Sequence, residues 1–261
     1  MKEIDELIEI MDTLRGENGC NWDKKQTHET LIPFLIEETY EVVDALESKD
    51  FNHLKEELGD LLFQVVFHAR LTKENSLFEF KDVAKEISEK LIRRHPHIFS
   101  NPENLPADQV LTNWDKIKKA EKAEKGVIHD SILDGVPKAL PALQRSEDIQ
   151  KKAAKVGFDW EKVEDVFEKI QEEMGELKEE IHVEEQNKER IEEEMGDLLF
   201  SVVNLSRFLK ISPEVALRKA NQKFETRFRK LEKILNSEYG GFENRSLEEM
   251  DRVWEMVKTE E

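Results

Sequence analysis

Apolar residues recur every three or four positions through long stretches of the 261-residue chain, with charged residues between them. This spacing is typical of amphipathic helices. The clearest case is a pair of stripes separated by a short polar segment: Ile170, Met174, Leu177 and Ile181, then Met195, Leu198, Leu199, Val202 and Val203. We expect the two helices to pack against each other through these stripes. The pattern predicts an all-α protein.

Several helix ends are marked by residues that favour capping. Residues 76–79 and 246–249 fit the capping box, in which a serine hydroxyl and a glutamate carboxylate satisfy backbone N–H groups left free at a helix start. Pro213 follows Ser212 and suits the first helical position, where the missing N–H costs nothing. Pro96 is expected to end the helix that carries Arg94, whereas the helix that carries Arg227 should continue.

The same segments occur twice in the same order. EELGDLLFQVVFHAR (56–70) resembles EEMGDLLFSVVNLSR (193–207), IEETYEVVDAL (36–46) resembles QEEMGELKEEI (171–181), and CNWDKKQ (20–26) resembles FDWEKVE (158–164). We therefore predict a tandem duplication of a helical-bundle domain of about five helices. Glycines and prolines between residues 126 and 141 interrupt the helical pattern, so one copy is expected in residues 1–125 and the other in residues 126–261.

Charge and composition exclude several classes of protein. A net charge of -19 would repel a phosphate backbone, so nucleic acid is not expected as a partner. No apolar run approaches the length of a membrane span, and the charged N-terminal helix does not resemble a signal peptide. Cys20 is the only cysteine, which rules out a disulfide framework and a cysteine zinc site. A cytoplasmic protein is the expectation.

Each copy carries two pairs of acidic residues on the helices that flank a predicted turn. The members of a pair are three residues apart and share a helix face. The midpoints between the pairs fall at Lys49 and Glu185, so in an antiparallel hairpin the four carboxylates stand at one level. They are Glu38, Glu41, Glu57 and Asp60 in the first copy, and Glu173, Glu176, Glu194 and Asp197 in the second.

Four converging carboxylates repel one another unless a cation lies between them. Oxygen ligands at this spacing suit Mg²⁺, with Mn²⁺ as the alternative. In a chain with 59 acidic residues a single such pair would be read as a solvated helix face, but duplication in register favours a metal site. A di-iron carboxylate site needs Glu-x-x-His on each of two helices, and only residues 179–182 fit.

The acidic segments also carry a family resemblance. EExxE (37–41 and 172–176) followed by ExxD (57–60 and 194–197) is similar to the MazG family of all-α nucleoside triphosphate pyrophosphohydrolases, and RRHPHIF (93–99) and LPALQRSEDIQKKAAKVGFDW (140–160) resemble segments of its two-domain bacterial members. Asn21 departs from the family pattern, which has proline there. The resemblance implies Mg²⁺-dependent hydrolysis of nucleoside triphosphates to monophosphate and pyrophosphate, control or cleaning of nucleotide pools, and a homodimer.

The resemblance also assigns roles to residues of the second copy. Its acidic quartet would hold the metal, and Glu172 and Glu193 would either lie just outside the metal ligands and support them or orient the attacking water. Lys223 and Arg227, which repeat Lys90 and Arg94 of the first copy, would bind the phosphates. Trp254 would stack on the base.

The resemblance points to the second copy as the principal catalyst. Trp22 and Trp160 are interpreted as anchors of the loop that enters the second helix of each copy. The alternative function is a noncatalytic acidic helical module that binds a nucleotide or a partner through the same face.

Overall fold

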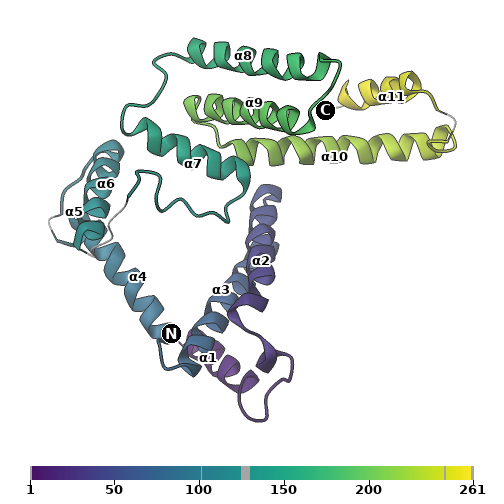
Figure 1. Ribbon diagram of the computed structural model, residues 1–261. Coiled ribbons are helices and arrows are strands. Elements are labelled where there is room, and N and C mark those ends of the chain that lie inside the picture. The colour runs from purple at the N-terminus through teal and green to yellow at the C-terminus, as the bar shows by residue number, and fades with distance from the viewer. Residues whose placement is uncertain (1, 101, 125–129, 244, 260–261) are drawn as a thin grey trace. The chain divides into compact units, whose positions relative to one another are not determined.

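The computed structural model describes residues 2–100, 102–124, 130–243 and 245–259 (Figure 1). Throughout these residues the regular elements are helices and no strand occurs, which confirms the all-α prediction. The chain divides into two compact units, Met1–Val127 and Ile128–Glu261. The predicted boundary between residues 125 and 126 lies outside the described residues.

The first unit is built around a long helical hairpin. Its elements are α1 (Lys2–Leu14), η1 (Asp23–Lys25), α2 (His28–Ser48), α3 (Phe51–Glu74), α4 (Phe80–Arg94), α5 (Pro96–Phe99) and α6 (Ala107–Glu124). The turn between α2 and α3 lies where it was predicted. Lys49 closes α2 in the left-handed conformation, and the Asp50 carboxylate accepts the backbone N–H groups of Asn52 and His53 at 3.0 and 3.1 Å.

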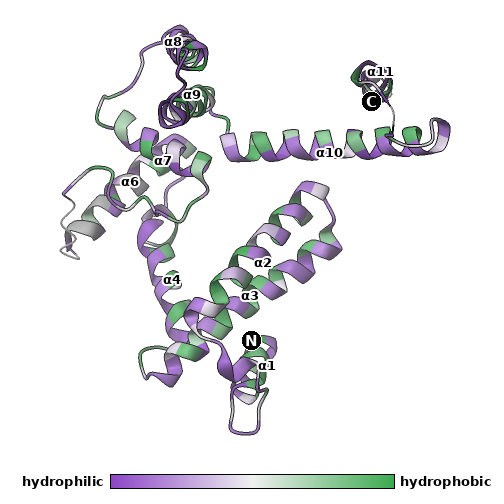
Figure 2. Ribbon diagram, turned by 45° about the vertical axis from the view of Figure 1, so that its right-hand side comes forward, coloured by the Kyte–Doolittle hydropathy of each residue, from purple (hydrophilic) through white to green (hydrophobic). Residues whose placement is uncertain are grey.

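The second unit contains two hairpins. Its elements are α7 (Ala142–Ala154), α8 (Val163–His182), α9 (Lys188–Phe208), α10 (Pro213–Glu238) and α11 (Leu247–Thr259). Helices α8 and α9 form the hairpin that corresponds to α2 and α3, and its turn lies in the predicted polar segment. Helices α10 and α11 pack through the buried side chains of Leu231, Leu235, Val253 and Val257. Helix α10 begins beside the end of α9 and then extends away from the α8–α9 hairpin (Figure 2).

Most of the predicted helix ends are confirmed. Ser246 and Glu249 exchange the two capping-box hydrogen bonds at 3.0 and 3.2 Å, Pro213 begins α10, and α4 ends before Pro96. The box predicted at residues 76–79 is wrong, because α4 begins at Phe80 and Glu79 is its N-cap. Ser76 instead takes a left-handed conformation and donates its backbone N–H to the carbonyl of Lys73, which closes α3.

The apolar stripes of α8 and α9 are only partly buried. Leu177 and Val203 lie in the interior as expected, but other members of the stripes remain exposed on the hairpin surface: Met174, Ile181, Met195, Leu199 and Val202. The exposed stripes therefore form an apolar face on an otherwise charged hairpin.

Among the described residues, no helix combines the length and apolar character needed to cross a bilayer.

Candidate metal centre

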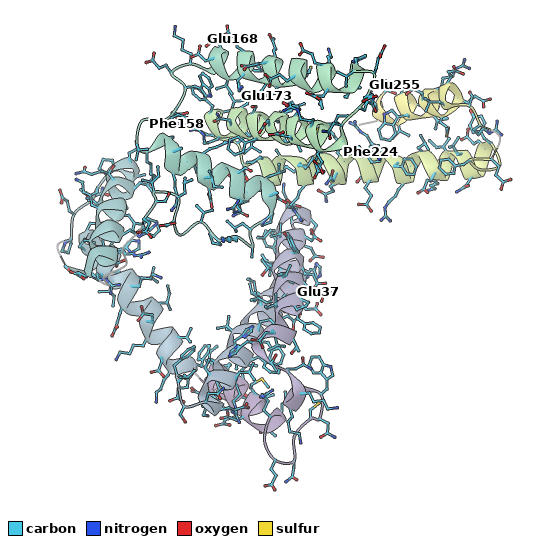
Figure 3. The ribbon with its side chains drawn as sticks, in the orientation of Figure 1. Glu37, Phe158, Glu168, Glu173, Phe224 and Glu255 are labelled. Carbon is cyan, nitrogen blue, oxygen red and sulfur yellow. The ribbon has the colours of Figure 1, made fainter. Side chains whose placement is uncertain are left out.

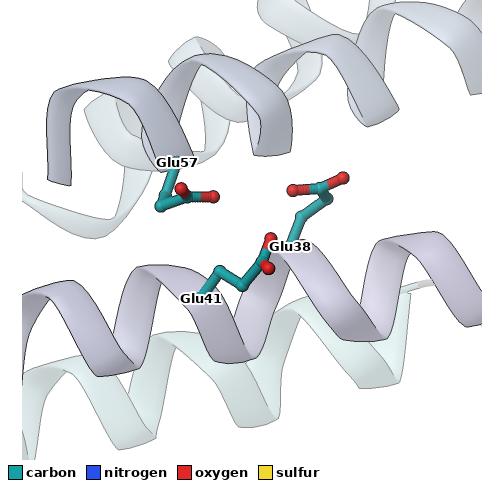
Figure 4. Close-up of side chains that lie close together, drawn as sticks. All are labelled: Glu38, Glu41 and Glu57. Atoms are coloured by element: carbon teal, nitrogen blue, oxygen red, sulfur yellow. The ribbon is translucent and has the colours of Figure 1, made fainter. Parts of the chain in front are cut away.

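Three predicted ligands of the first copy converge between α2 and α3. Glu38 and Glu41 project from α2 and Glu57 projects from α3 toward them (Figure 4). One carboxylate oxygen from each lies within 4.8 Å of the others. Asp60, the fourth predicted ligand, lies outside this group but is close enough for its charge to raise the pKa of Glu38.

The second copy repeats the arrangement with a different selection from the quartet. Glu173 of α8 and Glu194 and Asp197 of α9 bring one oxygen each within 4.8 Å of one another. Glu173 lies between the two helices, whereas Glu168 lies on the outer side of α8 (Figure 3). Glu176 is outside the group, although its charge raises the pKa of Glu194. Glu172 and Glu193, the predicted water-orienting residues, are exposed beside the cluster.

The carboxylates are partly withdrawn from water and crowd one another. Burial first, and then the charges of Asp60 and Glu41, raise the pKa of Glu38 to about 7. Burial also raises the pKa values of Glu57 and Glu194, with neighbouring carboxylates adding to the effect. Crowded oxygen donors in a half-buried site fit a hard divalent cation, which would relieve their repulsion.

Basic residues lie beside the acidic cluster of the second copy. The Lys169 ammonium is 2.7 Å from Glu173 and 3.0 Å from Glu172, and these bonds raise the pKa of Lys169. Arg190 lies 3.7 Å from Glu194. Lys169 was not predicted as a site residue, although its position four residues before Glu173 places both on one face of α8.

The predicted phosphate-binding and base-stacking residues lie on the other hairpin. Lys223 is exposed on α10, and Arg227 lies one turn further along the same helix. Trp254 of α11 packs against Phe224 with ring centroids 5.2 Å apart. Because α10 extends away from the α8–α9 hairpin (Figure 2), these residues lie on a different hairpin from the acidic cluster.

Comparison with known proteins places these observations in a family. The MazG nucleotide pyrophosphohydrolase domain matches residues 26–99 and again residues 161–231. Each match includes one helical hairpin with its acidic cluster. The fold therefore defines the class of protein: it is an all-α protein with a duplicated domain that holds paired carboxylates across a helical hairpin.

Full-length relatives agree with that match. The chain is 47% identical to the nucleoside triphosphate pyrophosphohydrolase of Escherichia coli strain K12, over all of this chain and 99% of that protein. It is 46% identical to the nucleoside triphosphate pyrophosphohydrolase/pyrophosphatase MazG of Thermotoga maritima, over 98% of this chain and 95% of that one. The protein belongs to the MazG family.

Proposed function

We propose that this protein hydrolyses nucleoside triphosphates to the monophosphate and pyrophosphate at the α8–α9 cluster. The observation that carries the proposal is the convergence of Glu173, Glu194 and Asp197 within 4.8 Å on a family-defining hairpin. Water would attack the α-phosphorus, and the bond from this phosphorus to the oxygen that bridges it to the β-phosphorus would break. Full-length relatives carry this activity in their names. Removal of triphosphates in this way would control or clean the nucleotide pool.

In this proposal, one set of residues binds the metal and another orients the attacking water. Glu173, Glu176, Glu194 and Asp197 would hold Mg²⁺, or Mn²⁺ as the alternative. When bound, the ion supplies positive charge against the phosphate oxygens and lowers the pKa of a bound water. Glu172 and Glu193 orient the attacking water from the rim of the cluster.

A homodimer would account for the exposed apolar face of the α8–α9 hairpin. Met174 and Ile181 of α8, with Met195, Leu199 and Val202 of α9, would be covered by a second copy. The same assembly offers a way to bring Lys223 and Arg227 of α10 to the acidic cluster of a partner subunit. The stacking role of Trp254, the cytoplasmic location and the exclusion of nucleic acid stay predictions.

Product analysis tests the reaction directly. Each nucleoside triphosphate is incubated with the full chain and Mg²⁺, and the products are separated by chromatography. We expect monophosphate and pyrophosphate, with no turnover in EDTA. Diphosphate with orthophosphate would place attack at the terminal phosphorus and contradict the proposal. Absence of turnover with every triphosphate would support the noncatalytic binding module.

A further inference from the structure

A cavity of about 570 Å³ opens in the second unit between α7 and α9. Its volume lies in the range of small-molecule sites. The residues that line it come from α7, from α9 and from the segments that precede α7 and α8, and none of them is among those assigned to the metal, the phosphates or the base. The exposed apolar stripes of the α8–α9 hairpin also lie outside the lining. The cavity is therefore separate from the site described above.

The first copy fills the corresponding position with a core side chain. In the repeat, Asn204 stands where the first copy has Phe67, and Phe200 stands where it has Phe63. Phe67 is 1% exposed and packs edge-on against Phe63, with ring centroids 5.6 Å apart. In the second copy Phe200 is 42% exposed. A position that serves the core of one copy is thus part of an open cavity in the other.

A buried amide gives the cavity an unsatisfied acceptor. Gln150 of α7 is 6% exposed, and its Nε2 donates to the backbone carbonyl of Phe200 at 2.9 Å. Its Oε1 is buried and has no hydrogen-bond partner within the described part of the chain. Leaving a buried acceptor unsatisfied costs free energy, so this atom calls for a donor from an occupant of the cavity.

The charged side chains of the described lining neutralise each other. Arg207 Nη1 donates to Asp159 at 3.0 Å, and Arg207 Nη2 donates to the same carboxylate. Arg207 also donates to Asn204 Oδ1 from Nε at 3.1 Å and from Nη2 at 2.7 Å. A bidentate pair of this kind leaves no net charge for a ligand. The lining therefore suits an uncharged molecule and not a polyanionic triphosphate.

Flat apolar side chains form much of the wall. Phe158 is 82% exposed, and Trp160, which the sequence suggested as a loop anchor, is 42% exposed. Phe200 adds a third ring and Ile149 an aliphatic side chain. Water could satisfy Gln150, but it would leave these apolar groups hydrated. A ring that carries a donor would bury them and bond to Gln150 at the same time.

From these observations we infer that the cavity binds a small, uncharged ring compound with an N–H donor, and that this ligand is not the nucleoside triphosphate. Gln150 Oε1 accepts the N–H, and the rings of Phe158, Trp160 and Phe200 contact the faces of the ligand. Because its Oδ1 is held by Arg207, Asn204 has Nδ2 to donate to an acceptor on the ligand. The inference goes beyond the proposed function and does not depend on it.

The position of the cavity along α9 suits an effector. Phe200 and Asn204 follow Asp197 by three and seven residues, so they lie one and two turns further along the helix. The bond from Gln150 already ties α7 to the carbonyl of Phe200. A ligand held here contacts the helix that supplies Asp197 without occupying the acidic cluster, and it can be bound together with a triphosphate.

Two probes of the same shape test the donor. Indole carries an N–H, and indene has a CH₂ group in its place. Each is titrated into the full chain in EDTA, and binding is followed by ligand-observed NMR. We expect indole to bind wild type about five- to ten-fold more tightly than indene, because indene leaves Gln150 Oε1 unsatisfied. Equal affinity for the two probes, or binding of neither, would overturn the inference.

Two variants locate the binding site. Gln150→Leu removes the acceptor and should bring the affinities for indole and indene within about twofold of each other. Asn204→Phe places the residue of the first copy in the cavity and should weaken both probes at least about ten-fold. Circular dichroism checks that each variant is folded. The matched control is Asn52→Phe, at an exposed position of the first unit, which should bind like wild type. Unchanged binding by Asn204→Phe would place the probes elsewhere and overturn the inference.

Competition separates this site from the proposed active site. Indole is titrated again with Mg²⁺ and a saturating α,β-methylene nucleoside triphosphate, which resists cleavage at the proposed bond, and we expect its affinity to be unchanged. Displacement of indole would assign the cavity to the substrate and overturn the inference. Indole binding detected only after dilution to monomers would make a second copy the occupant, with the same consequence. None of these readouts uses pyrophosphate release, so failure here is distinguishable from failure of the proposed function.

Discussion

The two copies of the hairpin keep the same acidic residues but surround them differently. Beside Glu38 of the first copy stands Phe34, and the pKa of Glu38 rises to about 7. At the matched position of the second copy stands Lys169, whose ammonium lies 2.7 Å from Glu173. In the first copy His53 pairs with Glu57, whereas at the matched position of the second copy Arg190 lies near Glu194. The second cluster therefore has two cationic side chains beside it, Lys169 and Arg190, where the matched positions of the first copy hold Phe34 and His53.

The difference extends to the phosphate-binding residues predicted from the repeat. In the first copy Glu121 of α6 accepts from Arg93 at 2.7 Å and from Arg94 at 2.6 Å. These bonds lower the pKa of Glu121 to about 2 and leave Arg94 largely buried. The counterpart of Arg227 is thus committed to holding α6 on α4. A duplicated domain can keep its ligand set while one copy uses its cations for its own fold.

The largest effect should come from removing the acids of one copy at a time. Glu194→Ala with Asp197→Ala removes two converging ligands, and we expect turnover of nucleoside triphosphates to fall by at least about 100-fold. Glu57→Ala with Asp60→Ala changes the matched positions of the first copy and should leave turnover within about threefold of wild type. Pyrophosphate release at saturating Mg²⁺ is the measurement.

Two outcomes of the paired experiment would contradict this division of labour. Equal halving by each double variant would mean that both copies catalyse. Loss of turnover only when the first copy is changed would assign catalysis to α2 and α3. Helical content measured by circular dichroism shows whether either double variant has lost its fold instead of its ligands.

A smaller effect is expected from the phosphate-binding pair. Lys223→Ala with Arg227→Ala should lower kcat/KM for a triphosphate by about 30-fold, which corresponds to about 2 kcal/mol. Mg²⁺ affinity, measured by calorimetry, should not change. In the first copy, Lys90→Ala with Arg94→Lys should alter kcat/KM by less than about twofold, because Arg94 is already occupied by Glu121. Equal loss of Mg²⁺ affinity in the second-copy variant would indicate a structural role for Lys223 and Arg227.

The helices, the duplication and the acidic clusters could be predicted from local patterns. Acidic residues at i and i+3 share a helix face. Because the turns at Lys49 and Glu185 lie midway between the two acidic pairs of each copy, the pairs stand at the same height in an antiparallel hairpin, and their carboxylates come together once the hairpin forms. Glu121 bonds to Arg93 and Arg94, which are 28 and 27 positions away along the chain, and no sequence period encodes that approach. Ser76 was predicted to cap the start of α4 but instead closes α3, because the end of α3 and the start of α4 lie within the same few residues.

The smallest effect concerns the bonds that hold Arg94 within the first unit. Glu121→Gln removes the charge that holds both arginines, and we expect the first unit to lose about 1–2 kcal/mol of unfolding free energy at pH 7. Hydrogen exchange in peptides from α4 and α6 measures this loss within the first unit. Glu225→Gln is the control, since its pairing with Arg229 is exposed and should contribute little.

The pH dependence of that loss identifies its cause. A carboxylate whose pKa falls on folding stabilises the folded state above its unfolded pKa, and the contribution disappears as the pH falls through the folded pKa. For Glu121 the window runs from about 4.5 down to about 2. The difference in exchange between wild type and Glu121→Gln should therefore be constant from pH 7 to about pH 5 and shrink steadily below it. A difference that persists unchanged at pH 3 would mean that packing of α6, not the charge of Glu121, holds Arg94, and would leave Arg94 available to bind phosphate.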